Sequence, residues 1–350
     1  MHILPLAPPH LPDNVHPSTA VRALNQAFNA HMRQLSGGDD FAVPIAQDLN
    51  NLRPVPQRTL IVLAAVQDPQ GHTTLPSQED ETDLGFRGFA TLRLPHVDNT
   101  EVAHASFTFP GGFDGPTFSA LWEEVIARCR AAERTRLIVG SDCPAGGLDT
   151  DPLCRALRGQ GMRTAVEETA SLLDLALSPR PQLPAGLTPV FFDDVEVPEE
   201  LVDSFLEIMT ISSQDVPSAA PSAEPWTRQR LADAAAHLSA APGTLVNACL
   251  VDAAGIAAFS YARVPGPEEA ARVAEQDLTV VHRRARGQGL GMTVKAALYD
   301  HLRQRFPDIA RVSTFNATTN TQMLAINHKL GLEPKFTWAS WEGDVNQQQA

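Results

Sequence analysis

The chain has 350 residues, of which 43% are hydrophobic and 19% charged, and its formal net charge at pH 7 is -14. This length and hydrophobic content suffice for two hydrophobic cores, and no run approaches the roughly 18 apolar residues of a membrane span. The negative charge disfavours nucleic acid as a partner. It either steers cationic amines towards the protein or serves solubility alone.

The start of the chain and its cysteines indicate a cytoplasmic protein. Met1-His2-Ile3 lacks the basic region and apolar core of a secretion signal. No CxxC spacing and no paired histidines accompany the cysteines, so we expect reduced, mostly buried thiols and no metal site. They are Cys129, Cys143, Cys154 and Cys249.

The two halves of the chain contain similar segments in the same order. The matching pairs are Phe89–Pro95 with Phe259–Pro265, Arg136–Val139 with Arg311–Thr314, and Gly161-Met162 with Gly331-Leu332. A tandem duplication accounts for this order.

A proline-dense stretch, residues 179–184, separates the halves, because it breaks both helix and strand and stiffens a connection. We therefore predict a first domain over residues 1–178 and a second over residues 185–350. Within the second, Glu199–Leu238 predicts two helices joined by the proline-broken segment Ser212–Pro221. Connections of this kind often carry specificity.

The most informative stretch is Arg286–Gly291, which lies between a predicted strand, Val273–Val281, and a helix that starts at about Leu290. A glycine-rich turn that opens a helix is an anion site, because backbone N–H groups and the positive helix end favour phosphate oxygens. No Walker loop occurs, and the dinucleotide fingerprint fails because Met292 replaces its third glycine. A plain strand-to-helix turn is the alternative.

Apolar residues recur at helical spacing from Leu290 to Leu302, which predicts a helix whose outward face carries Lys295, Asp300 and Arg303. Residues 309–316 predict a strand. Residues 320–332 predict a helix with N-cap chemistry at its start and a glycine at its end. Trp338 and Trp341 lie on the last strand-like run.

The Arg-x-x-Gly-x-Gly pattern that starts at Arg284, together with the asparagine-led helix that closes in Leu-Gly-Leu, resembles the GNAT family of acyl-CoA N-acyltransferases. The resemblance covers residues 189–341. Asn327 departs from it, because many members have a tyrosine in that position. The resemblance implies an α/β protein with two tandem GNAT-like domains, each a mixed, mostly antiparallel sheet flanked by helices.

The resemblance also implies direct transfer of acetyl from acetyl-CoA to a primary amine of a small molecule in a ternary complex. In the family, the fourth strand splays from the fifth, and its backbone amides hold the thioester and pantetheine. The cofactor-binding residues implied here are Leu278, Thr279, Val280, Arg284, Arg286, Gly287, Gln288, Gly289, Leu290, Gly291, Asn316, Asn320 and Asn327.

Glu275 and Asp277 are two residues apart and project from one face of the predicted strand. Either carboxylate can accept the amine's proton if burial raises its pKa towards neutrality, and we place Glu275 first. A solvated acidic strand end is the alternative. Asn327 cannot replace tyrosine as a proton donor.

The first copy carries Pro110–Ser119 where the second has its glycine-rich loop. Asp114 replaces Arg286, and Thr117 and Ser119 replace glycines. The negative charge and the extra Cβ atoms oppose a pyrophosphate, so we expect a degenerate domain without CoA and with a structural role.

Two alternatives stay open. One is an acyl-CoA-binding sensor or scaffold without turnover, which the missing tyrosine favours. The other is an acyltransferase with a different donor or acceptor, as in mycothiol-synthase-like tandem members. The sequence does not identify the acceptor, and it leaves a homodimer open.

Overall fold

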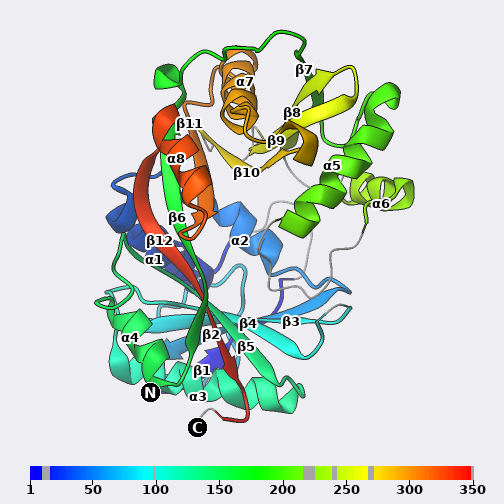
Figure 1. Cartoon of the computed structure of the whole chain (residues 1–350). Coiled ribbons are helices and arrows are strands. Elements are labelled where there is room, and N and C mark those ends of the chain that lie inside the picture. Colours follow the sequence, from blue (N-terminus) through cyan, green and yellow to red (C-terminus); the bar gives the residue numbers. More distant parts are fainter. Residues whose placement is uncertain (10–15, 98, 216–224, 239–242, 267–271, 348–350) are drawn as a thin grey trace. The chain divides into compact units, whose positions relative to one another are not determined.

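The computed structural model describes residues 1–9, 16–97, 99–215, 225–238, 243–266 and 272–347. The chain forms two compact units (Figure 1). Unit 1 consists of residues 1–169 and 335–350, and unit 2 of residues 170–334.

The two halves of the chain run through the same order of elements, one strand, two helices, three strands, and then helix, strand, helix and strand. The first half comprises β1 (His2–Pro5), α1 (Thr19–Ser36), α2 (Ile45–Asn51), β2 (Arg58–Val66), β3 (Gly88–Pro95), β4 (Val102–Thr108), α3 (Gly115–Ala131), β5 (Arg136–Pro144), α4 (Pro152–Gly159) and β6 (Arg163–Asp174).

The second half repeats this order, with short 3-10 turns added. It comprises η1 (Leu175–Leu177), β7 (Thr188–Asp193), η2 (Glu199–Leu201), α5 (Val202–Asp215), α6 (Arg228–Leu238), β8 (Thr244–Asp252), β9 (Gly255–Val264), β10 (Val273–Val281), η4 (Arg283–Ala285), α7 (Leu290–Arg305), β11 (Arg311–Ala317), α8 (Thr321–Leu330) and β12 (Glu333–Asp344). The mixed α/β fold predicted from the sequence is confirmed.

The strands of the two halves follow the same order in their sheets, except that each sheet includes the last strand of the other half of the chain. Unit 1 has the order β1-β2-β3-β4-β5-β12, and unit 2 has β6-β11-β10-β9-β8-β7. β12 pairs antiparallel with β5 from Phe336↔Pro144 to Asp344↔Arg136. β6 starts in unit 1, and its residues from Ala170 onwards belong to unit 2.

Each sheet packs helices on both faces. In unit 1, α3 and α4 cover one face of the sheet through a core centred on Trp122 and Trp341, while α1 and α2 cover the other. In unit 2, α7 covers one face and α5 the other, as the ribbon shows (Figure 1). The alternation of residues along the strands therefore decides which helix each side chain meets.

The compact units divide the chain elsewhere than the sequence-based boundaries do. The segment after β6 packs on unit 2, because the backbone N–H of Leu175 donates to Ala310 O at 2.9 Å and Arg303 donates to the carbonyls of Leu175 and Ser178. Residues 335–350, expected with the second domain, belong to unit 1. Of the predicted connection Ser212–Pro221, the part from residue 216 lies outside the described residues.

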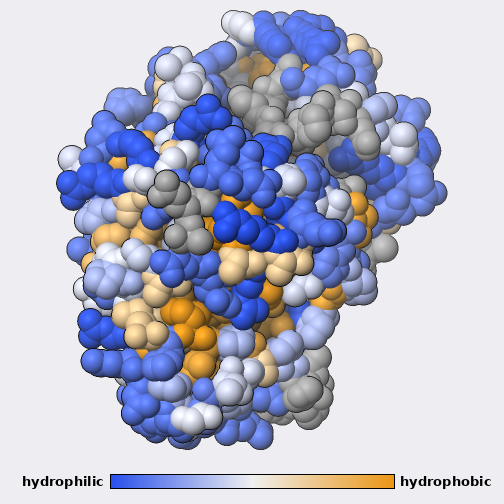
Figure 2. All heavy atoms as spheres, turned by 90° about the horizontal axis from the view of Figure 1, so that it is seen from below, coloured by the Kyte–Doolittle hydropathy of each residue, from blue (hydrophilic) through white to orange (hydrophobic). Residues whose placement is uncertain are grey.

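All four cysteines are free thiols and buried, as predicted. In the described part of the chain, no helix combines the length and the apolar character needed to cross a membrane. The surface in Figure 2 is mostly hydrophilic and includes an apolar area. The exposed large hydrophobic side chains among the described residues are Met1, Val97, Leu177, Leu183 and Met292.

Because β12 completes the sheet of unit 1, Trp341→Ala should lower the free energy of unfolding by about 3 to 5 kcal/mol, although the residue lies near the C-terminus. The Trp341 side chain is 0% exposed, and its indole Nε1 donates to Ser141 Oγ at 2.9 Å. Urea unfolding followed by circular dichroism checks this. The half-buried Trp338 gives a control on the same strand, and an equal loss in Trp338→Ala would contradict the prediction.

Candidate functional site

The strands β10 and β11 of unit 2 run parallel and then part. Their pairing extends only from Val273↔Arg311 to Glu275↔Ser313, whereas β10 continues to Val281 and β11 to Ala317. Beyond Glu275, the side of β10 that faces β11 has no ladder partner among the described residues. Backbone N–H groups in this opening are therefore available to a ligand.

A β-bulge in β10 coincides with the point where the strands part. On β9 the register advances from Ala262 to Ser260 while on β10 it advances from Gln276 to Thr279, so β10 contains one extra residue. An extra residue reverses which side chains face which side of a sheet. Ala274 therefore packs with α7, whereas Val280, six residues further on, packs with α5.

Buried polar side chains stabilise the bulge by hydrogen bonds. Gln276 is 2% exposed, and its Nε2 donates to Leu278 O at 3.0 Å. Ser260 Oγ donates to the same carbonyl at 2.8 Å. Thr314 Oγ1 donates to Gln276 Oε1 at 3.1 Å, which links the bulge to β11. Because these groups satisfy one another, the bulge is fixed rather than strained.

The glycine-rich loop lies after the bulge and opens α7. Gly287 and Gly289 have φ of 78° and 76°, which favours glycine. A Cβ added at either position would meet no described heavy atom within 4 Å, so the backbone faces open space. Gly289 is the N-cap of α7, and no side chain of the described residues caps it. The loop thus has the backbone geometry that favours an anion at a helix N-terminus.

Two arginines near the loop, Arg284 and Arg286, have different hydrogen-bond partners. Arg284 forms an ion pair with Asp252, with Nη2 to Oδ1 at 3.0 Å, and this hydrogen bonding lowers the pKa of Asp252. That geometry gives Arg284 a structural role. Arg286 Nε donates to Val281 O at 3.3 Å, and both Arg286 and Gln288 are exposed at the loop.

Asn327, in the usual tyrosine position, belongs to a buried chain of polar side chains. Lys295 Nζ donates to Asn327 Oδ1 at 2.7 Å, and Asn327 Nδ2 donates to Asn316 Oδ1 at 2.5 Å. Asn327 is 2% exposed, while Asn316 lies half-buried near the end of β11. The amide of Asn327 thus orients Asn316. The predicted ligand Asn320 instead caps α8, where its Oδ1 accepts from Met323 N.

The sequence-based expectation that Lys295 faces outward is wrong. Its side chain is 0% exposed, and burial lowers the pKa of its ammonium group to about 7. The amphipathic pattern failed because α7 is buried over most of its surface, so apolar spacing does not mark a solvent face. No sequence signal near Lys295 identifies its partner, which comes from α8.

Glu275 and Asp277 both lie exposed on the α5 face, as predicted from their spacing. Asp277 Oδ2 accepts from Tyr261 OH at 2.6 Å. Partial desolvation raises the pKa of Glu275, the charge of Asp277 adds to this, and the charge of Arg263 opposes it. Tyr261 and Gln276 were not identified from the sequence, because their roles depend on the register between β9 and β10.

The equivalent region of unit 1 lacks these features. β4 and β5 stay paired over five positions, from Val102↔Arg136 to Ser106↔Gly140, and the pairing of β3 with β4 contains no bulge. At the start of α3, Asp114 accepts a hydrogen bond from Thr117 Oγ1, and Pro116 supplies no N–H.

Solved structures match this chain over nearly its whole length. The tandem GNAT protein from the clavulanic acid biosynthesis pathway, in its structure without acetyl-CoA, matches with a TM-score of 0.68 at 19% identity over 98% of each chain. The chain has a tandem GNAT fold. A GCN5-related N-acetyltransferase from Sphaerobacter thermophilus matches this fold with a TM-score of 0.60 at 15% identity, covering 96% of this chain and 97% of that one.

A third match is a GCN5-related glucosamine N-acetyltransferase region in a fungal multidomain GH3 beta-N-acetylglucosaminidase. Its TM-score is 0.57 at 13% identity, over 98% of this chain and 38% of that one. No protein-family model matches the sequence, and no curated protein matches it significantly.

Lys295 makes stability depend on pH. Its pKa is about 7 in the folded chain against an ordinary value of 10.5, so between these values the unfolded chain binds more protons and stability rises with pH. From pH 7 to about 9.5 this gain should be roughly 2 to 3 kcal/mol. Lys295→Met should remove it relative to the wild type, as measured by urea unfolding at both pH values.

The exposed Lys329 on α8 provides the matched control, because Lys329→Met removes the same charge without a buried partner. An unchanged pH slope in Lys295→Met would show that Lys295 is charged and hydrated in the folded protein.

Proposed function

We propose that unit 2 is an acyl-CoA-dependent N-acyltransferase that transfers an acetyl group to the amine of a small molecule. The observation that carries the proposal is the opening between β10 and β11, which leads directly into the uncapped N-terminus of α7. One continuous path thus offers backbone donors both for a thioester and for a pyrophosphate.

In this proposal the loop from Arg286 to Gly291 donates backbone N–H groups to the pyrophosphate. Gly287 and Gly289 allow close approach because nothing described fills the space above them within 4 Å. The amides of Leu278, Thr279 and Val280 hold the pantetheine and stabilise the developing charge on the thioester oxygen. Acetyl-CoA supplies the activated acyl group.

The acidic residues on β10 supply the proton acceptor. We favour Glu275, because Oδ2 of Asp277 already accepts a hydrogen bond from Tyr261 OH. The raised pKa of Glu275 moves its carboxylate towards the range in which a general base works at neutral pH. Both carboxylates also attract an ammonium group, which supports an amine acceptor.

No tyrosine is available to protonate the leaving thiolate in the usual position. Asn327 directs its amide to Lys295 and Asn316, so we assign it a positioning role towards the end of β11. The thiolate then takes its proton from water. The same observation supports a second candidate function, an acyl-CoA sensor without turnover.

We further propose that unit 1 binds no CoA. Asp114 brings negative charge to the start of α3, and the paired strands β4 and β5 leave a shorter opening. The proposal predicts one CoA per chain, and calorimetry that finds two equivalent sites would contradict it.

Gln288→Glu tests the loop without strain, because Gln288 is exposed and lies outside the left-handed region, whereas both flanking glycines have φ above 70°. A carboxylate at this position should repel the pyrophosphate and weaken CoA binding about 10-fold. Titration calorimetry measures this. Gln182→Glu makes the same charge change at an exposed site in the connection before β7, and equal effects from both variants would argue against the loop.

Glu275→Gln keeps the shape of the side chain but removes the proton acceptor, so kcat should fall roughly 10²-fold with little change in CoA affinity. In the wild type, the rate should rise with pH as Glu275 ionises, and this limb should disappear in the variant. Asp277→Asn is the matched control. Free-thiol release from acetyl-CoA with a panel of amines gives the readout, and no release with any amine would favour the sensor.

A further inference from the structure

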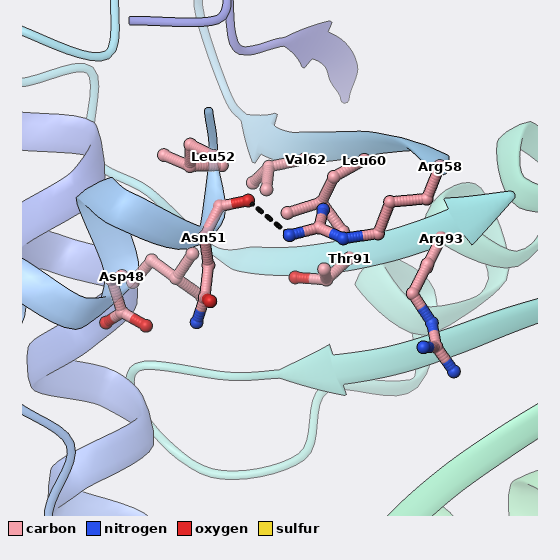
Figure 3. Close-up of a pocket in the computed structure, with 9 residues that line it drawn as sticks. Asp48, Asn51, Leu52, Arg58, Leu60, Val62, Thr91 and Arg93 are labelled. Carbon is pink, nitrogen blue, oxygen red and sulfur yellow. Dashed lines mark hydrogen bonds between the residues drawn. The ribbon is translucent and has the colours of Figure 1, made fainter. Parts of the chain in front are cut away.

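Unit 1 contains a pocket of about 350 Å³ between its helices α1 and α2 and the sheet strands β2 and β3 (Figure 3). This volume lies within the range of small-molecule sites. The pocket is lined by Leu24, Asp48, Asn51, Leu52, Arg58, Leu60, Val62, Thr91 and Arg93. Nothing in the proposed reaction of unit 2 uses it.

One end of the pocket is positive. Arg58 and Arg93 come from adjacent strands, and neither forms an ion pair within the described ranges of the chain. Arg58 Nη2 donates to the backbone carbonyl of Asn51 at 3.0 Å, which holds its guanidinium along the pocket (Figure 3). Burial lowers the pKa of Arg93, and repulsion from Arg58 adds to this. Two guanidinium groups from adjacent strands favour an anionic group in this part of the pocket.

The other end is acidic. Asp48 lies on α2 at the opposite side of the pocket from Arg93 (Figure 3). Its Oδ2 accepts a hydrogen bond from Asn25 Nδ2 at 2.7 Å, which fixes the carboxylate. No cation pairs with Asp48 in the part of the molecule that the structure describes. Burial raises the pKa of Asp48, so its carboxylate gains from a cationic or hydrogen-bonding ligand.

Between the charged ends the wall is apolar. Leu24 and Leu52 face the pocket from the helices, and Leu60 and Val62 from β2. A complementary ligand thus has an anionic group, a short apolar body and an amine. A ligand with only one charge would leave one end of the pocket unpaired.

The charges also differ from those at the same place in unit 2. Arg93 stands opposite His104 on β4, just as Arg263 stands opposite Glu275 on β10. Burial and the charge of Arg93 lower the pKa of His104 to about 4, so this histidine is neutral at pH 7. The position of the proposed base thus lacks a carboxylate in unit 1, which leaves its arginines available to a ligand.

We propose that unit 1 binds a small zwitterion with a carboxylate and an amine, of the amino-acid class, with the carboxylate at Arg58 and Arg93 and the amine at Asp48. Binding involves no acyl transfer, because the pairing of β3 with β4 contains no bulge, the opening between β4 and β5 is shorter, and Asp114 brings negative charge to the start of α3. The proposal does not depend on CoA binding by unit 2.

Titration of the full chain with four probes tests this. They are 5-aminopentanoate and norvaline, which carry both charges on short chains, and pentanoate and pentylamine, which carry one each. We expect 5-aminopentanoate, whose two charges lie at opposite ends of the chain, to bind at least roughly 10-fold more tightly than norvaline or either singly charged probe. Tighter binding of norvaline would place the amine beside the carboxylate and would contradict the assignment of the amine to Asp48.

Variants test which side chains bind the carboxylate and which bind the amine of the ligand. Arg93→Gln should weaken zwitterion binding at least about 10-fold, and Asp48→Asn should do so too while leaving pentanoate binding unchanged. Arg87→Gln, at an exposed arginine just before β3, is the matched control. Far-UV circular dichroism and urea unfolding of all three variants, compared with the wild type, check that the variants are folded.

Equal affinity for pentanoate and 5-aminopentanoate would overturn the zwitterion assignment in favour of a simple anion site. Zwitterion binding that survives both Arg93→Gln and Asp48→Asn, or no binding of any probe at millimolar concentration, would overturn the pocket assignment altogether.

Discussion

The backbone of β10 has to satisfy its hydrogen bonds without β11 over its second half, and the proposed active site depends on this constraint. An unpaired strand edge inside a protein is costly unless something else meets its polar groups. Here the side chains of Gln276 and Ser260 donate to the carbonyl of Leu278 in the bulge, and Thr314 donates to Gln276. The edge of β10 that β11 leaves unpaired is the one proposed to bind the thioester. The opening between β10 and β11, the glycine-rich loop and the N-terminus of α7 therefore form one continuous proposed site.

Sequence patterns predicted the parts of this proposed site that depend on local backbone rules. The strand Val273–Val281, the glycine loop and the α8 segment could be predicted because glycine, caps and periodicity act over a few residues. Lys295 could not, since its partner Asn327 comes from another helix and α7 has almost no solvent face. The strand exchange could not be predicted either. A strand pattern indicates that a segment is extended, but the choice between two similar sheets depends on the whole fold.

The duplicated fold separates scaffold from chemistry. Arg93 and Arg263 occupy the same place in the two sheets, yet one faces a neutral histidine and the other a carboxylate. The residues facing these arginines thus differ in charge, while both units keep the same order of elements. Function thus differs between the copies through a few side chains on a common frame.

The position of β12 next to β5 has a consequence for how the protein is made. β5 ends at Pro144, whereas its partner residue Phe336 lies far along the chain. At ordinary rates of synthesis, the ribosome needs about 10 to 40 s to add the intervening residues. During that time the β5 edge of the first sheet is uncovered, and such edges pair readily with other chains. The sheet of unit 1 can therefore be completed only after β12 has been synthesised, which makes this step sensitive to chaperones and to the crowding of nascent chains.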